Sequence, residues 1–594
     1  MKKIYIVLFT LLATGMTLTS CSDKLMDELN TDDTKAAVID PNTQLTTALL
    51  QTYGDFQVMD TYRNYITGFT QYFAGAWNVT NFAGSNNHDE TIESLWNRFY
   101  TIGIKNLVDG IDKSEDLPNV NAALRITKVY MISILTDAYG DVPCSEAGLG
   151  YLKSIATPRY DTQEEIYDYF FEELAECVAQ LGTGSDRISG DVTSLGGNIA
   201  AWKKFANSLR MRYAMRISDI NPVKAKAEFE KAINAEGGYI TSDAYDTYVK
   251  YIDVPFTFDE GAKKLDFRAN ALSGTLYGQK ADSPTMICAS LFDMMRNMED
   301  PRLYRICRHY DNLKRSNSKP DELTVDLTDE FIAYLQNKGK DDYACKIGDA
   351  WYEPWPSNIP EMVAIPTSFK EPEDPALDFF KKIRELDEAY PDAGFFKDGV
   401  NDNVRMMFPW LSIEFERSYR PGFLITSAEV HFLLAEAISK GWTAPGNMKT
   451  HFEEGIKDAM QMLNTHYLPD DQQIADAEIS TYILKVANSG ALDENPRNAI
   501  NTQAWILHLM NPSEGWANLR RADYPVLVDR SKREKYTSQF VYPDPDMSTP
   551  DRLLYPNLEG QYNKASFLEA LDRMGGTDDW HQRVWWDVKH GNFE

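Results

Sequence analysis

The clearest candidate for covalent chemistry is Cys21, which ends the sequence Leu18-Thr19-Ser20-Cys21 near the start of the chain. Lys2 and Lys3 lead into an apolar run over residues 4–16, which is too short for a bilayer-spanning helix of ~20 residues. A basic start, a short apolar middle and small residues before a cut site are typical of a secretory signal peptide. We therefore predict that residues 1–20 are removed and that the Cys21 thiol carries lipid. The alternative is a plain secretory signal with an incidental cysteine.

Lipid on Cys21 would hold the chain at a membrane. Leu-Thr-Ser-Cys resembles a bacterial lipobox, and the polar sequence starts immediately after the cysteine. Each buried methylene contributes ~0.8 kcal/mol, so one acyl chain binds weakly while two or three chains make a lasting anchor. No other apolar run in the sequence approaches transmembrane length. We expect membrane attachment through the lipid alone.

Sequence signals of catalysis are poor. The 8 histidines are scattered, and the sequence has no His-Glu-x-x-His, no Gly-x-Ser-x-Gly and no phosphate-binding loop. A glycosidase needs two carboxylates ~5–9.5 Å apart, and sequence spacing identifies no such pair among 89 acidic residues. Asp544-Pro545-Asp546 and residues 398–403 carry oxygen ligands that suit calcium, but solvated acidic loops are the favoured interpretation. We expect no catalytic residues, no metal and no cofactor.

The composition is that of a folded globular protein, with 43% hydrophobic and 12% aromatic residues. The formal net charge is −29, and such an acidic surface repels nucleic acid and anionic lipid headgroups. We therefore expect no nucleic-acid partner. The 5 cysteines after Cys21 are widely spaced and form no Cys-x-x-Cys, so we interpret them as core residues, with one bridging pair left open.

Helical periodicity dominates the chain after a polar tether, residues 21–40. Apolar residues recur at threes and fours in segments separated by turns: 90–112, 120–139, 162–181, 200–217, 222–235, 284–298, 426–441, 447–464, 471–487 and 497–510. Thr162 followed by Glu165, and Thr426 followed by Glu429, fit capping boxes. Alternating strand and crossover-helix units are absent, so the predicted fold class is all-α or mostly α, in one domain over residues 41–594.

Two irregular insertions interrupt the helical pattern, at about residues 239–280 and 340–420. The second is rich in proline and is the longest irregular region. Long irregular segments on a rigid frame often carry function. The helix pair 426–464 resembles a tetratricopeptide repeat, although no regular period near 34 residues recurs along the chain.

Several segments, in this order, resemble the SusD/RagB family of outer-membrane lipoproteins of Bacteroidetes. They are Leu135 to Pro143, Pro158 to Thr162, Trp202 to Leu209, Leu424 to Glu429 with Leu434 to Ala437, and Tyr555-Pro556 followed by Glu559 and Asn563. The resemblance covers nearly the whole chain after the signal peptide.

The resemblance implies four tetratricopeptide-like helix pairs in a right-handed superhelix, with long loops on one ligand-binding face. It also implies a lipoprotein on the outside of the outer membrane, seated on a SusC-like TonB-dependent transporter. Asp23, Asp27 and Glu28 resemble the acidic export signal of surface lipoproteins in Bacteroidetes. The implied activity is capture of a nutrient, usually an oligosaccharide and sometimes a peptide, without catalysis.

Two loops carry the predicted ligand contacts. A sugar presents C–H groups on its faces and hydroxyls at its rim, so a binding site needs flat aromatic rings beside amides and carboxylates. Most of the 72 aromatic residues must be core, as we expect for Trp96 and Trp202 in helical stripes. The first loop instead places aromatics among turn and amide residues, and the second lies in the proline-rich region and is expected to be exposed. The predicted binding residues are Trp77, Asn78, Asn81 and Phe82 in the first, and Trp351, Tyr352 and Trp355 in the second.

Two other functions stay open from the sequence. A lipid-anchored glycoside hydrolase would release products from glycans, and a structural or adhesion protein of helical repeats would bind no soluble ligand. No residue distinguishes an oligosaccharide from a peptide as the ligand.

Overall fold

A computed structural model describes residues 39–75, 90–254, 266–277, 285–308, 345–347, 350–352, 410–527 and 549–588. The chain divides into two units, Met1–Asp40 and Pro41–Glu594. The predicted signal peptide, Cys21 and nearly all of the predicted tether lie outside the described residues. Among the residues that are described, no helix is both long enough and apolar enough to cross a membrane.

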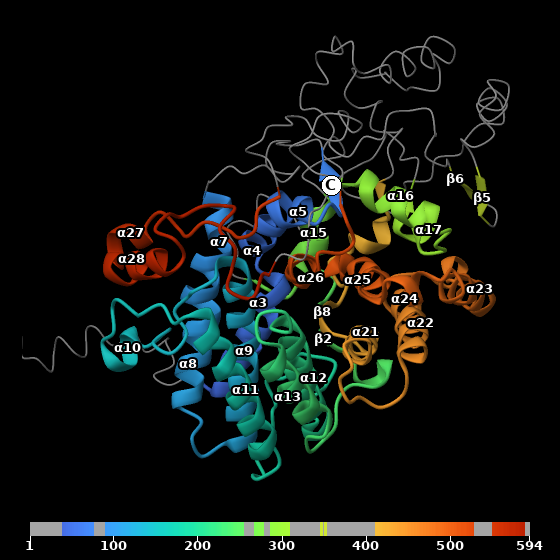
Figure 1. Ribbon diagram of the computed structural model, residues 1–594. Coiled ribbons are helices and arrows are strands. Elements are labelled where there is room, and N and C mark those ends of the chain that lie inside the picture. Colours follow the sequence, from blue (N-terminus) through green and yellow to red (C-terminus); the bar gives the residue numbers. More distant parts are fainter. Residues whose placement is uncertain are drawn as a thin grey trace, which may run out of the picture. The chain divides into compact units, whose positions relative to one another are not determined.

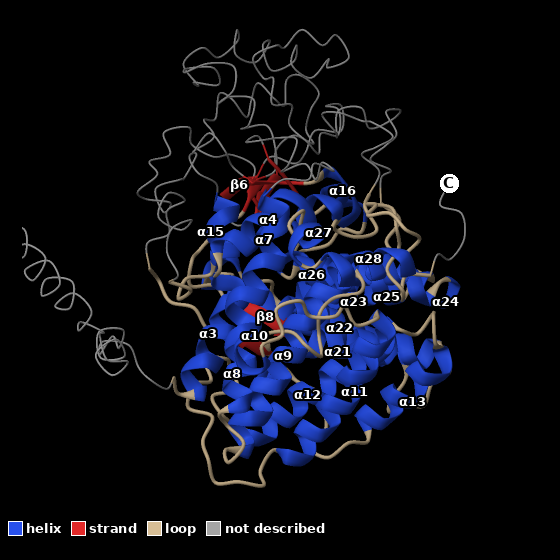
Figure 2. Cartoon of the chain, turned by 90° about the vertical axis from the view of Figure 1, so that its left-hand side faces the viewer, coloured by secondary structure: helices blue, strands red, loops and turns tan. Residues whose placement is uncertain are grey.

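Helices make up most of the described chain (Figure 2), which confirms the predicted mostly-α class. The α-helices are α3 (Pro41–Gly54), α4 (Phe56–Thr61), α5 (Thr67–Phe69), α7 (Glu90–Arg98), α8 (Lys105–Asp112), α9 (Pro118–Tyr139), α10 (Gly150–Lys153), α11 (Gln163–Gln180), α12 (Ile199–Arg216), α13 (Pro222–Ile233), α15 (Ala271–Tyr277), α16 (Ala289–Asn297), α17 (Leu303–Ile306), α21 (Ser427–Ser439), α22 (Met448–His466), α23 (Asp476–Ala487), α24 (Ala491–Glu494), α25 (Pro496–Leu507), α26 (Pro512–Ala522), α27 (Glu559–Tyr562) and α28 (Lys564–Arg573). Single turns of other helix types are η1 (Tyr62–Ile66), η2 (Phe99–Ile104), η3 (Asp243–Tyr245), η7 (Ile413–Phe415), η8 (Asp470–Gln472) and η9 (His508–Met510).

Consecutive helices pack against one another in two groups (Figure 1). In the first, α8 packs on α9, α9 on α11, α11 on α12 and α12 on α13; in the second, α21 packs on α22 and α25, and α25 on α26. Contacts of α12 with α21 and of α9 with α26 join the groups. Nearly every residue of α9 is buried, as its apolar residues on several sides predict. Gly140, at φ 91°, ends α9 in a backbone conformation that other residues rarely adopt.

The helix starts test the two predicted capping boxes. The Thr162 hydroxyl accepts from the Glu165 N–H at 3.2 Å and the Glu165 carboxylate accepts from the Thr162 N–H at 3.0 Å, so the first box is confirmed. The second prediction is half wrong. The Thr426 hydroxyl accepts from the Glu429 N–H at 3.3 Å, but the Glu429 carboxylate pairs instead with Arg212 at 2.6 Å.

In the part of the chain that the structure describes, eight short strands form three small sheets. They are β1 (Phe73–Gly75), β2 (Thr247–Val249), β3 (Thr285–Ile287), β4 (Cys307–Arg308), β5 (Cys345–Ile347), β6 (Ala350–Tyr352), β7 (Trp410–Leu411) and β8 (Gly422–Ile425). The order in the largest sheet is β1-β3-β7-β4, while β2 pairs with β8 and β5 with β6. All these pairs are antiparallel.

Three sequence expectations need correction. The predicted helix over 284–298 begins only at Ala289, because residues 285–287 form β3 and pair with β1. The irregular stretch 239–280, predicted as loops and short strands, contains the short strand β2 but also the helix α15, which was not predicted. No helix was predicted after residue 510, but the structure contains α26, α27 and α28 there; α26 buries polar residues such as Glu514 and Arg521, which hide its helical period.

The predicted core residues are buried. Trp96 and Trp202 are 3% and 0% exposed, and both belong to the hydrophobic core. Cys144, Cys177, Cys288 and Cys307 are buried and free, as we predicted for core cysteines.

Candidate functional site

The four-stranded sheet β1-β3-β7-β4, which we call the strand platform, gathers the ends of the segments predicted to bind ligand. Gly75 of β1 is the partner of Thr285 of β3, and Arg308 of β4 is the partner of Trp410 of β7. Because adjacent strands lie ~4.8 Å apart, the outer strands of the sheet are ~14 Å apart. The segments that follow β1 and β4 and those that precede β3 and β7 therefore begin or end within a short distance of one another.

The first predicted binding loop starts at the platform. Trp77 follows Gly75, the last residue of β1, by two positions. Trp77, Asn78, Asn81, Phe82 and also Trp355 of the second loop lie outside the described residues. Trp351 and Tyr352 are in β6, where the backbone pairs them with Lys346 and Cys345 of β5.

Buried hydrogen bonds fix the platform to the helices below it. The Tyr72 hydroxyl donates to the Trp505 carbonyl at 2.6 Å, and the Trp505 indole N–H donates to the Thr70 carbonyl at 3.0 Å. The two rings are 5.2 Å apart, so α25 holds the start of β1 at three points. Gln71 has a left-handed backbone, φ 54°, and its side chain accepts from the Ser290 hydroxyl of α16. The start of β1 is therefore tied to both α25 and α16.

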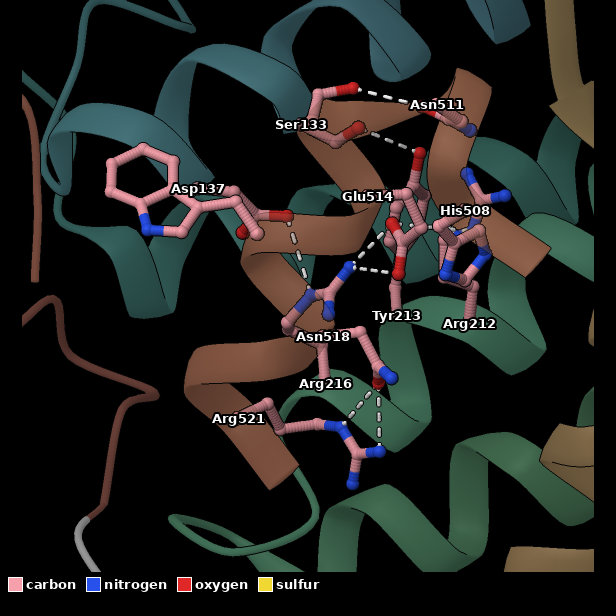
Figure 3. Close-up of polar contacts among 12 residues, drawn as sticks. Ser133, Asp137, Arg212, Tyr213, Arg216, His508, Asn511, Glu514, Asn518 and Arg521 are labelled. Atoms are coloured by element: carbon pink, nitrogen blue, oxygen red, sulfur yellow. Dashed lines mark hydrogen bonds and ion pairs between the residues drawn. The ribbon is translucent and has the colours of Figure 1, made fainter. Parts of the chain in front are cut away.

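A buried ionic network lies among α9, α12, α21 and α26 (Figure 3). Arg212 binds the Glu429 carboxylate in a bidentate pair at 2.6 and 2.7 Å. Arg216 donates to Glu514 at 2.6 Å and lies 3.3 Å from Asp137. Bidentate charge-assisted bonds are the strong kind, and they join four helices that are far apart in the sequence.

A second buried cluster continues the network toward the far end of α21. Arg521 of α26 binds Glu436 at 2.6 and 2.7 Å, and Asn501 donates to the same carboxylate at 3.2 Å. Asn518 donates to Asn501 at 3.0 Å. Every one of these side chains is buried, so the cluster fixes α21, α25 and α26 relative to one another.

The pKa values of these carboxyls show which interaction dominates. Burial alone raises a carboxyl pKa. At Glu429 burial raises the pKa most, but Arg212 and the hydrogen bond with His508 together outweigh it and lower the pKa to about 2. At Glu436 the cations Arg521, Lys440 and Arg497 together outweigh burial and lower the pKa to about 2. At Asp137 burial outweighs Arg216 and raises the pKa. The two glutamates are thus held ionised beside their arginines, an arrangement that orients helices.

Three of the family-like segments meet in one place. The Tyr160 hydroxyl donates to Glu559, and the Asn563 amide donates to the Pro158 carbonyl at 2.8 Å. The Tyr555 hydroxyl donates to the Asp141 carbonyl at 2.7 Å. These bonds close a cluster with the buried Trp96, 5.6 Å from the rings of Tyr160 and Tyr555. The shared segments therefore serve to dock the C-terminal helices on α9 and α11.

The ionic network was not predicted from the sequence. Arg212, Arg216, Glu514 and Arg521 are central to it and none was predicted. One signal was present: Arg210, Arg212 and Arg216 interrupt the apolar residues of α12, a pattern unlike a solvated helical face. The partners Glu429 of Arg212 and Glu514 of Arg216 lie 217 and 298 residues away, and no local pattern identifies them.

Comparison with family models finds two matches that together span most of the chain. Residues 33–324 match the SusD-like model described as "Starch-binding associating with outer membrane". Residues 365–587 match the model described as "Susd and RagB outer membrane lipoprotein". A search of the curated proteins finds no match.

Solved structures agree with the family models. A "Bacteroidetes AC2a SusD-like" protein is 38% identical, with 93% of this chain and 100% of that chain covered and a TM-score of 0.75. A protein described as chitin-binding is 27% identical over 93% of this chain and 100% of that chain, with a TM-score of 0.67. A chitin-binding SusD homolog from Flavobacterium johnsoniae is 20% identical over the same shares, with a TM-score of 0.63, and shows the shared fold.

These findings define a SusD-like helical protein. The chain belongs to the SusD/RagB family of outer-membrane lipoproteins, as its sequence segments indicate. The mostly helical fold is that of its solved neighbours.

Proposed function

We propose that the chain is a surface-exposed outer-membrane lipoprotein that binds an oligosaccharide and delivers it to a SusC-like TonB-dependent transporter. In this proposal the protein binds its ligand without converting it. The observation that carries the ligand class is the similarity, over 93% of the chain, to a solved chitin-binding protein at 27% identity. A peptide ligand is the alternative within the same family.

The strand platform supports the proposed position of the binding site. It joins the rigid helical frame to the start of the loop that contains Trp77. The residues that we propose as ligand contacts are Trp77, Asn78, Asn81 and Phe82, together with Trp351, Tyr352 and Trp355. Each well-placed ring adds ~0.5–1.5 kcal/mol to binding beyond the burial of its area. A few rings with polar contacts suit dissociation constants from about micromolar to millimolar, which correspond to binding free energies of about −8 to −4 kcal/mol.

The membrane part of the proposal rests on the sequence. Cys21 follows a signal-peptide pattern, and the family models describe outer-membrane proteins. We propose that lipid on Cys21 holds the protein on the outer membrane, facing the exterior, beside its transporter.

Calorimetric titration of the mature chain tests the binding function. We expect saturable binding of one class among chitin oligosaccharides, starch oligosaccharides and a peptide mixture. The double variant Trp77→Ala/Trp355→Ala is expected to bind about 5- to 150-fold more weakly, because two rings contribute ~1–3 kcal/mol. Its helicity, measured by circular dichroism, is expected to be unchanged.

A matched control separates loop contacts from general loss of aromatics. Tyr151 and Tyr562 are 83% and 73% exposed and lie on α10 and α27, and Tyr151→Ala/Tyr562→Ala is expected to leave affinity unchanged. Equal affinity of the wild type and the tryptophan variant would remove these loops from the proposal. Release of products from the glycans would favour the hydrolase instead.

A further inference from the structure

A small cavity lies where α17, α21, α22 and η9 meet. Its volume is about 30 Å³. Apolar side chains such as Phe415 and Ala459 form much of its wall, but Arg302, Tyr467 and His508 also line it. The cavity borders the ionic network, because Glu429 of the network lines it and His508 lies beside Glu429.

Three buried polar atoms belong to these lining residues and have no hydrogen-bond partner among the described residues. They are Nη1 of Arg302, the hydroxyl oxygen of Tyr467 and Nδ1 of His508. The three residues are only 1%, 1% and 4% exposed. A buried polar atom without a partner lowers stability, and native proteins rarely leave several on one cavity.

The remaining atoms of these side chains are held in place, so the three side chains cannot turn to find other partners. Arg302 donates to Asp300 at 2.5 Å and to Gln503 at 2.6 Å. The Tyr467 ring stacks on Phe415 with centroids 4.5 Å apart and an angle of 15°.

The hydrogen-bonding roles of the three atoms define the ligand. Nε2 of His508 lies 3.3 Å from the Glu429 carboxylate, which only accepts, so Nε2 carries a proton, while Nδ1 can accept when it has no proton and donate when it has one. Arg302 Nη1 can only donate, and the Tyr467 hydroxyl can do either. An ammonium ion cannot accept from Arg302 and does not fit the site. A neutral molecule that both donates and accepts fits all three atoms.

We propose that this cavity binds one or two ordered water molecules that join Arg302, Tyr467 and His508. A buried water needs ~10–15 Å³ and typically makes about three hydrogen bonds, which agrees with a cavity of about 30 Å³. Arg302 precedes α17, which leads directly into β4 of the strand platform. Tyr467 follows α22, and His508 follows α25. The water connects the platform side of the molecule to the helix pair α21–α22.

Crystals of the full mature chain test the proposal directly. We expect density for water within hydrogen-bond distance of at least two of the three atoms in a native crystal. We expect no xenon peak under pressure and no anomalous bromide peak after a soak. A xenon peak would show a dry cavity, and a bromide peak would show an anion site; either result, or a native cavity without density, overturns the proposal.

The variant Tyr467→Phe tests the proposal in solution, because it deletes only the hydroxyl and keeps the ring stack. In a hydrated cavity it removes a hydrogen bond, so Tm is expected to fall by about 1–2 °C. The control Tyr213→Phe deletes a hydroxyl that donates to Ser133 at 2.9 Å, and it is expected to lower Tm similarly. An unchanged or raised Tm for Tyr467→Phe alone would show that its hydroxyl has no partner and would overturn the proposal.

Discussion

At the scale of single residues, the stability of this protein depends on buried charges that are paired. Arg212 and Glu429 are 3% and 4% exposed, so neither charge is stabilised by water when its partner is removed. Burying a salt bridge does not guarantee a net gain over apolar residues, but breaking one leaves an uncompensated charge. A substitution that removes one partner of such a pair is therefore expected to lower the free energy of unfolding.

The variant Arg212→Met is expected to lower the free energy of unfolding by ~3–5 kcal/mol, because it leaves the buried Glu429 carboxylate without its cationic partner. Urea unfolding measures this loss. The double variant Arg212→Met/Glu429→Gln is expected to recover part of it. As a control, Lys449→Met removes an exposed ion pair with Glu453, 3.9 Å long, and is expected to cost less than ~1 kcal/mol. Equal losses in the two single variants would contradict the account.

The Glu436–Arg521 pair predicts a pH dependence. The folded-state pKa of Glu436 is about 2, below its ordinary value of 4.5, so the folded state binds fewer protons than the unfolded state between these values. The pair's contribution is therefore present above pH 4.5 and is lost as the pH falls toward 2. We expect Glu436→Gln to be less stable than the wild type at pH 7 and to approach it at pH 3. Unfolding measured at both pH values checks this, and a constant difference would refute it.

At the scale of elements, α11 shows how a local sequence signal becomes a stable helix start. Thr162→Ala removes the hydroxyl half of the confirmed capping box and is expected to cost ~1 kcal/mol, within a range of 0.5–2. Thermal unfolding measures the change. Thr162→Ser keeps a hydroxyl at the same position and is expected to stay near the wild type. A loss in the serine variant as large as in the alanine variant would point to lost packing of the methyl group instead.

The helices could be predicted because their signals are local. Gly140 after α9, the capping box of α11 and Pro222 at the start of α13 lie within a turn of the boundaries that they set. The strand platform could not be predicted, because β1 pairs with β3 more than 200 residues away. β7 consists only of Trp410–Leu411, which is too short to show a strand pattern. α26 was missed for a different reason: it buries Glu514, Asn518 and Arg521, so its inward face does not read as apolar.

The candidate site was predictable only in part. The sequence indicated two loops that carry aromatic residues outside the helical pattern. In the structure the first of these loops begins directly after β1. The residues that fix this strand, such as Gln71 and Trp505, gave no signal, because their roles depend on contacts between distant segments. The segments that resemble the family lie where the C-terminal helices pack on the first helix group. Tyr160 and Asn563 form hydrogen bonds across this contact.

At the scale of the whole molecule, the proposed location depends on Cys21. The variant Cys21→Ser is expected to lose labelling by radioactive palmitate and to leave the outer-membrane fraction, because no sulfur remains for acylation. Labelling and cell fractionation of both forms measure this. The folded domain is expected to be unchanged, which circular dichroism checks. Retention of the serine variant in the outer membrane at wild-type levels would contradict lipid anchoring through this residue.

In the proposed mode of binding, loops carried by the strand platform hold the ligand while the helical frame stays unchanged. Hydrogen exchange followed by mass spectrometry, with and without a saturating oligosaccharide, tests this most directly. We predict that the ligand slows exchange in peptides covering residues 76–89 and 350–356 and leaves α21–α22 and α27–α28 unaffected. Slowed exchange confined to those helices, with none in the two loops, would contradict the account.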